Sequence, residues 1–215
     1  MQQGERGRQR RRRVQRTRWI SVLTALPIAL VAADAQSRDS IHSTLVTVEI
    51  ATGGIDTVLT AARHFEAPNW SPDGMYFVVN SGGRLYRIGA TGDRQLVEIP
   101  TGFAILMAVQ GTSPSGCAAT ALTSCATRLN NDHGITADGR FFILSHHAAE
   151  HVEDPRQDWL ASSVYLMPID GSAPPRKVTT KAPSFWHGVT PDGQTLAYVG
   201  RRNDEWDIYS IPTAG

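Results

Sequence analysis

Three copies of one sequence block constrain the fold of this chain more than any other feature. Each block has a Pro-Asp-Gly or Ala-Asp-Gly corner between two apolar runs. The three corners are Asp73-Gly74, Asp138-Gly139 and Asp192-Gly193. Proline suits the first corner of a type I turn, and glycine takes the left-handed conformation that closes it. We therefore predict three β-hairpins, whose aspartates bond to the turn and are structural, not catalytic.

A further β segment rich in tyrosine and isoleucine follows each hairpin. The segments are RLYRI at 84–88, SVYLMPI at 163–169 and WDIYSI at 206–211, and polar turn residues follow each one. Tandem units of three or four short antiparallel strands are typical of β-propeller blades. A β-sandwich is the main alternative, because it needs a similar number of strands but no repetition.

The repeat predicts an all-β chain, with residues 36–215 forming propeller blades. The segment 43–60 resembles the outer two strands of a blade, so we expect a half blade, two blades and most of a third, as part of a six-bladed ring. The half blade and the incomplete third blade leave open that the chain is a piece of a longer one, or that its blades are completed by oligomerisation.

The spacing between corners predicts two long loops. Asp73 and Asp138 are 65 residues apart, and Asp138 and Asp192 are 54 residues apart, whereas a blade takes roughly 40–50 residues. We assign the first surplus to an inserted loop at 105–126 and the second to a strand connection at 146–162. The inserted loop contains Cys117 and Cys125, which form either a disulfide or two free thiols.

Residues 1–35 differ in composition from the rest of the chain. They contain eight arginines between Arg6 and Arg18, an uncharged stretch at 19–33 and the sequence Ala33-Asp34-Ala35. This order predicts a secretory signal peptide cleaved before Gln36, which leaves no stable membrane span; an uncleaved signal anchor is the alternative. The remaining 13 basic and 18 acidic residues give a net charge of −5, and without a basic face we expect no binding to nucleic acid.

The repeated blocks resemble a known family. APNWSPDGMYFVVNSGGRLYRI at 67–88 and APSFWHGVTPDGQTLAYVGRRNDEWDIYSIP at 182–212 are similar to the WD40-like, or PD40, repeats of TolB-type β-propellers. The resemblance implies a secreted or periplasmic module of the cell envelope that takes part in Tol-type transport by binding proteins and catalyses nothing.

Two histidines are the candidate site residues. His133 and His187 each lie five residues before an Asp-Gly corner, with Asp132 and Trp186 beside them. The start of an innermost strand faces the channel of a propeller, so these four residues are our candidate ligand-binding group for an envelope protein, an oligosaccharide or a peptide. The two imidazoles are candidate ligands of a divalent metal, and hydrogen bonding between blades is the alternative role.

A second resemblance keeps a catalytic alternative open. Oligogalacturonide lyases have a similar repeat and hold a metal with channel-facing histidines, which implies a metal-assisted carbohydrate-active enzyme with His133 and His187 as ligands. The letters His147-x-x-Glu150-His151 match an inverted zincin motif, but their expected place in a loop favours chance. No Gly-x-Ser-x-Gly elbow, phosphate loop or dinucleotide fingerprint is present. An incomplete product without autonomous function is the third hypothesis.

Overall fold

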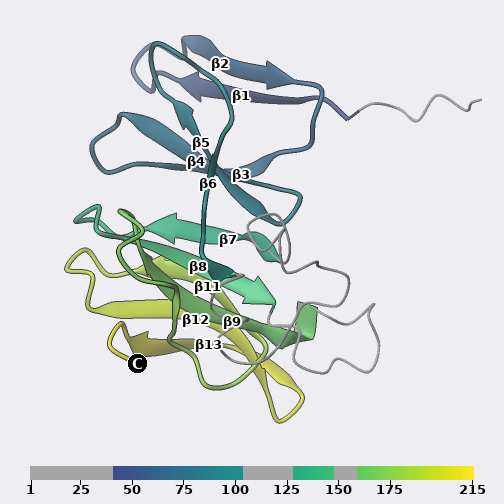
Figure 1. The fold of residues 1–215 in the computed structure, drawn as a ribbon, viewed down its shortest axis with the longest axis vertical. Helices are drawn as coiled ribbons and strands as arrows, with labels where there is room; N and C mark the ends of the chain where they lie inside the picture. The colour runs from purple at the N-terminus through teal and green to yellow at the C-terminus, as the bar shows by residue number, and fades with distance from the viewer. Residues whose placement is uncertain (1–40, 104–127, 148–158) are drawn as a thin grey trace, which may run out of the picture. The chain divides into compact units, whose positions relative to one another are not determined.

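The computed structural model describes residues 41–103, 128–147 and 159–215, which contain thirteen β-strands in four antiparallel sheets (Figure 1). The N-terminal sheet comprises β1 (Ser43–Val48) and β2 (Ile55–Ala61). Blade 1 comprises β3 (Glu66–Trp70), β4 (Tyr76–Ser81), β5 (Arg84–Gly89) and β6 (Val97–Ile99). Blade 2 comprises β7 (Leu129–Ile135), β8 (Phe141–His147), β9 (Ser162–Pro168) and β10 (Arg176–Lys177). Blade 3 comprises β11 (Ser184–Val189), β12 (Thr195–Arg202) and β13 (Glu205–Pro212).

The strand order confirms the all-β prediction and the unit of three or four strands. In every sheet the strands pair with their neighbours in the chain. One boundary differs: β8 continues through His147, so the connection expected from residue 146 begins two residues later, because the ladder with β9 extends to Ser162. The predicted signal peptide, the insert at 105–126, Cys117 and Cys125, and Glu150 and His151 lie outside the described residues.

The Asp-Gly corners form the three predicted hairpin turns. Gly74, Gly139 and Gly193 have φ angles of 71°, 68° and 70°, the left-handed region that only glycine adopts without cost. The residue two before each aspartate is a serine or threonine whose hydroxyl donates to the carboxylate. In blade 1 this bond joins Ser71 Oγ to Asp73 Oδ1 at 2.6 Å, and the amide of Met75 donates to the same oxygen at 3.0 Å.

The same bonds recur in the other two turns. Thr136 Oγ1 and Thr190 Oγ1 each donate at 2.6 Å to the aspartate of their turn. These bonds lower the pKa of Asp73, Asp138 and Asp192 from the ordinary value of 3.8, with the hydroxyl as the first cause and the backbone amide as the second. The aspartates therefore hold the turns, as the sequence predicts.

This hydrogen bonding makes the stability of the fold depend on pH in the acidic range. A carboxyl group whose pKa is lower in the folded protein than in the unfolded chain stabilises the fold above its unfolded pKa, and the stabilisation is lost as the pH falls through the folded pKa. We expect the Tm of the wild type to fall more steeply below pH 3.8 than that of a variant with Asp73→Asn, Asp138→Asn and Asp192→Asn. Thermal melts across acidic pH measure this difference, with Asp93→Asn as the surface control; parallel curves for wild type and triple variant would contradict it.

The central strands of blades 1 and 2 bury both of their faces. Along β4, Phe77 and Val79 pack against the N-terminal sheet, whereas Val78 between them packs against blade 2. Along β8, Phe142 and Leu144 pack against blade 1. Side chains alternate across a strand, so a strand buried on both faces needs a continuous apolar run. This explains why an unbroken run follows the corners of blades 1 and 2.

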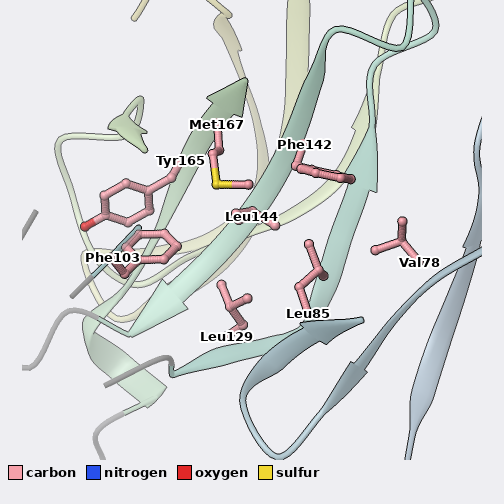
Figure 2. Packing of buried hydrophobic residues seen from close by; sticks show 8 residues of the cluster. All are labelled: Val78, Leu85, Phe103, Leu129, Phe142, Leu144, Tyr165 and Met167. Carbon is pink, nitrogen blue, oxygen red and sulfur yellow. The ribbon is translucent and has the colours of Figure 1, made fainter. Parts of the chain in front are cut away.

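The cluster between blades 1 and 2 shows this packing directly. Figure 2 shows side chains from both blades pointing into one space. Its buried members are Val78, Leu85, Phe103, Leu129, Phe142, Leu144, Tyr165 and Met167. A second cluster joins the N-terminal sheet to blade 1, and a third joins blade 2 to blade 3. The apolar residues of the repeated blocks therefore pack mainly between neighbouring blades.

A polar residue seven positions after each of the first two corner aspartates ties its blade to the next. Asn80 Nδ2 in blade 1 donates to the carbonyl oxygens of Leu129 and Asn130 in β7, at 3.0 and 2.9 Å. Ser145 Oγ in blade 2 accepts from the amide of Trp186 in β11 at 2.9 Å. Buried polar groups are stable when they are hydrogen-bonded, so these bonds fix the inner strands of neighbouring blades against each other.

Candidate functional site

The candidate residues lie on the first strands of blades 2 and 3. Strand β7 contacts both β3 and β11, so the first strands of consecutive blades lie side by side. Each of the three strands has an irregularity in its pairing: between Glu66 and Asn69, between Leu129 and His133, and between Trp186 and Gly188. Irregular pairing of this kind redirects side chains, and it decides where the two histidines point.

His133 is enclosed between blades. It pairs with Leu144 of β8 in regular register, its exposed fraction is 2%, and its Nε2 lies 3.4 Å from the carbonyl oxygen of Val78 in blade 1. Burial lowers the pKa of His133, opposed by its contacts with backbone groups, so the neutral imidazole is favoured. His133 therefore contacts the backbone of blade 1, which corresponds to the alternative role of a hydrogen bond between blades.

His187 has the same offset from its corner but a different environment. Trp186 pairs with Tyr198 and Gly188 pairs with Ala197, so His187 is the extra residue of a β-bulge. Its side chain is exposed. A bulge adds one residue to one strand of a pair, so equal sequence offsets do not give equal side-chain directions here. The two imidazoles consequently do not form an equivalent pair.

Asp132 is a half-buried carboxylate near His187. Asn130 Nδ2 donates to Asp132 Oδ2 at 3.0 Å. Burial raises the pKa of Asp132, and the negative charge of Glu66 adds to this, whereas the positive charge of His187 and the bond from Asn130 lower it. Asp132 and His187 are thus close enough for their charges to interact, although they come from different blades.

Trp186 crosses the boundary between blades 2 and 3. A Cβ atom placed on Gly134 would overlap three atoms of the six-membered ring of its indole. The glycine at this position therefore lets the indole lie directly on the backbone of β7. The indole Nε1 is buried and has no acceptor among the described residues. Asp132, Trp186 and His187 together form what we call the inner-strand site.

Four further residues contribute to this arrangement, and none of them is a candidate site residue in the sequence. Asn130 orients Asp132, Glu66 adds negative charge, Ser145 holds the backbone of Trp186, and Gly134 receives its ring. The sequence does contain a signal for Ser145, because Ser145 and Asn80 are both polar and each lies seven positions after the corner aspartate of its blade. The role of Gly134 depends on a ring from another blade, and no local pattern marks it.

The residues that the structure describes contain no group of three or more histidine, cysteine, aspartate or glutamate side chains placed to hold a metal ion. Within the same ranges, none of the helices has the length and apolar character needed to cross a membrane.

Comparison with known proteins identifies the fold. No protein-family model matches the chain. A solved structure of a candidate TolB from Agrobacterium tumefaciens superposes with a TM-score of 0.62 at 34% identity, over 81% of this chain and 51% of that chain. The chain has a TolB-like β-propeller fold. TolB from Acinetobacter baumannii superposes with a TM-score of 0.51 at 15% identity, over 79% of this chain and 35% of that chain, which is a likeness of fold alone.

A curated relative extends the comparison. An uncharacterized protein of Agrobacterium fabrum is 36% identical over 172 residues, which are 80% of this chain and 48% of that protein. The TolB-like chain thus spans about half the length of the relatives that it matches at more than 30% identity.

Proposed function

We propose that this chain is an exported, TolB-like binding module of the cell envelope, and that a protein partner meets it at the inner-strand site. The N-terminal 35 residues would direct export to the periplasm or beyond, where the signal is cleaved. The similarity to a candidate TolB at 34% identity supports a role in protein interaction. The role in Tol-type transport is part of the same proposal.

The observation that carries the proposal is the grouping of a carboxylate, an aromatic ring and an exposed imidazole at one blade boundary. Asp132 offers a carboxylate that accepts hydrogen bonds, Trp186 lays its indole across the boundary, and His187 is exposed. An extended peptide segment presents backbone amide donors, which a carboxylate can accept. Aromatic residues with one polar end are also enriched at protein interfaces.

A retention experiment tests the proposal. The chain is immobilised and exposed to a detergent extract of the envelope of its own organism, and retained proteins are quantified by mass spectrometry. We expect Asp132→Asn and His187→Gln each to reduce retention of the same envelope protein by roughly tenfold, as loss of a central contact does. Arg94→Gln is the matched control, because Arg94 pairs with Asp56 in the N-terminal sheet, away from the site. Equal retention by all four chains, or none by the wild type, would refute the proposal.

The metal-assisted alternative remains a separate proposal, favoured by one observation. The charge of His187 acts on the Asp132 carboxylate across the blade boundary, and carboxylates and imidazoles are both metal-ligand types. A metal bound there would polarise a uronate carboxylate and acidify the adjacent C–H. Stoichiometric metal in the purified protein, lost on His187→Ala, would support this alternative; metal content unchanged by His133→Ala and His187→Ala together would end it.

A further inference from the structure

A cleft of about 450 Å³ opens between blades 2 and 3, beside the Asp-Gly corners of both blades. We call it the corner cleft. Its lining includes Asp138 and Arg140 from the corner of blade 2 and Asp192 from the corner of blade 3, but none of the three residues of the inner-strand site. Sites for small molecules in proteins typically measure roughly 300–1,000 Å³. The corner cleft therefore has the size of a small-molecule site.

The apolar lining of the corner cleft comes from blade 2. Phe141 of β8 and Leu166 and Pro168 of β9 line it, together with Ala173 and Pro174 of the connection to β10. Leu166 is buried, whereas Phe141 and Pro168 are half-buried and keep part of their surface open to solvent. An apolar group that covers this partly open surface removes it from water, which stabilises binding.

Arg176 of β10 supplies a positive charge whose position is fixed. Its Nη1 donates to the carbonyl oxygen of Ala214 at 3.1 Å, and its Nη2 donates to that of Thr213. Both acceptors are neutral, so they orient the guanidinium without offsetting its charge. The amide of Thr213 in turn donates to the carbonyl oxygen of Gln194 at 2.9 Å. The guanidinium of a blade 2 residue is therefore anchored on blade 3.

Asp192 supplies a negative charge in the same cleft. Its Oδ1 accepts from the hydroxyl of Thr190 at 2.6 Å and from the amide of Gln194 at 3.0 Å. These two bonds lower the pKa of Asp192, the hydroxyl first and the amide second, so the carboxylate stays ionised at neutral pH. Along the described parts of the chain, neither Asp192 nor Arg176 belongs to an ion pair.

The other two charges in the corner cleft offset each other. The hydroxyl of Thr136 is the first cause of the lowered pKa of Asp138 and the amide of Arg140 is the second, and the positive charge of Arg140 adds to them. The side chains of Asp138 and Arg140 thus act on each other. This leaves Asp192 and Arg176 as the negative and positive charges that a ligand can neutralise.

The topology of blade 3 sets the separation of these two charges. Asp192 lies in the corner between β11 and β12, whereas the guanidinium of Arg176 lies at the carbonyl oxygens of residues 213 and 214, directly after β13. Neighbouring strands are about 4.8 Å apart, so one to two strand spacings separate the charges by about 5–10 Å. An extended peptide advances about 3.3–3.6 Å per residue. The two termini of a peptide of two or three residues therefore match this separation.

We propose that the corner cleft binds a short peptide of two or three residues by both of its free termini. The N-terminal ammonium meets Asp192, the C-terminal carboxylate meets Arg176, and an apolar side chain packs on Phe141 and Pro168. A guanidinium presents paired N–H donors that suit a carboxylate. This inference does not depend on the proposed function, because the corner cleft and the inner-strand site share no residue.

The groove between blades 1 and 2 provides an internal comparison. It measures about 360 Å³ and also contains an arginine, Arg87, which lies on the third strand of its blade, whereas Arg176 lies on the fourth. The acidic residue of this groove, Glu98, is already paired with Arg84 at 2.8 Å. Asp138, the corner aspartate of blade 2, is not among the residues that line it. This groove therefore lacks the available negative charge, and Arg87 is a matched control for Arg176.

An NMR titration of the full chain with the dipeptide leucyl-leucine tests the proposal. We expect saturable binding with a Kd of about 1 mM or below, and a shift of the amide signal of Gly193, which lines the cleft. The amide of Gly74 in the corner of blade 1 is the reference and should not shift. Saturation without a shift of Gly193, or no binding at all, would overturn the proposal.

Modified ligands test the contact at each terminus. Acetylation of the ammonium or amidation of the carboxylate should each weaken binding roughly tenfold, as the loss of a hydrogen-bonded charge does. Free leucine should also bind roughly tenfold more weakly, because its two charges are attached to one carbon and cannot reach both residues. Equal affinity for leucyl-leucine and its blocked forms would show that apolar contact alone holds the ligand, and would overturn the proposal.

Variants of the chain assign the two contacts. We expect Arg176→Gln and Asp192→Asn each to weaken binding of leucyl-leucine roughly tenfold, whereas Arg176→Lys, which keeps the charge, loses less and Arg87→Gln loses nothing. Arg176→Gln should bind the amidated dipeptide as well as the wild type does, because the carboxylate is then already absent. A merely structural role of Arg176 would weaken binding of both ligands equally. Cooperative thermal melting shows that each variant is folded, and wild-type affinity in folded Arg176→Gln would overturn the proposal.

Discussion

Phe142→Ala should lower the free energy of unfolding by about 3–5 kcal/mol, the usual cost of removing a buried phenylalanine ring. Phe142 is 2% exposed and lies at the boundary of blades 1 and 2, where Val78 and Leu85 come from one blade and Leu144 and Met167 from the other (Figure 2). The truncation leaves a cavity that neither blade can fill without moving against the other. Urea unfolding measures the change.

Met75→Ala is the matched control for this prediction. Met75 follows the corner of blade 1 and is largely exposed, so its truncation should change stability by no more than about 0.5 kcal/mol. If Phe142→Ala also costs less than about 1 kcal/mol, the two blades do not pack as described.

Gly134→Ala should cost about 1–3 kcal/mol, the typical cost of forcing extra volume into a packed site. The new methyl group would overlap the indole of Trp186, so either the ring or strand β7 must shift. Because Trp186 belongs to the inner-strand site, the variant should also reduce retention of the partner in the envelope experiment.

Gly188→Ala is a well-matched control. Gly188 has the same offset from its corner as Gly134, but a Cβ there meets only the Cβ of Ala197 at 3.9 Å, an ordinary contact. Alanine in a strand interior also loses less conformational entropy than glycine on folding, so we expect Gly188→Ala to be neutral or slightly stabilising. Equal costs at the two glycines would show that the indole does not lie on Gly134.

A double variant confirms the cause. Combining Gly134→Ala with Trp186→Leu removes the overlapping ring. The double variant should therefore lose less unfolding free energy than the sum of the losses of the two single variants. Strict additivity would place the cost of Gly134→Ala elsewhere in blade 2.

The fold was readable from the sequence because its determinants are local and repeated. Asp73, Asp138 and Asp192 sit in turns whose every bond lies within five residues, and glycine follows each one where the backbone requires it. The serine or threonine two residues before each aspartate is an equally local signal, because its hydroxyl donates to that aspartate. Apolar runs after the corners marked strands that are buried on both faces.

The site was only partly readable, because its geometry depends on pairing between strands and blades. Position alone made His133 and His187 equivalent. The bulge at His187 separates them, leaving one imidazole buried and the other exposed. Asp132 and Trp186 were selected as their neighbours in the sequence, and the structure brings Asp132 near His187 and lays Trp186 across Gly134. Which side chains meet across a blade boundary is a tertiary property that spacing does not encode.

The central claim is that blades 2 and 3 combine into one inner-strand site. An NMR titration of the Asp132 carboxyl tests this claim most directly. Burial should hold the pKa of Asp132 above its ordinary value of 3.8, and the positive charge of His187 should oppose this rise. We therefore predict that His187→Ala raises the pKa of Asp132 further, whereas Arg94→Gln leaves it unchanged. A pKa of Asp132 that does not respond to His187→Ala would show that the two blades do not bring these residues together.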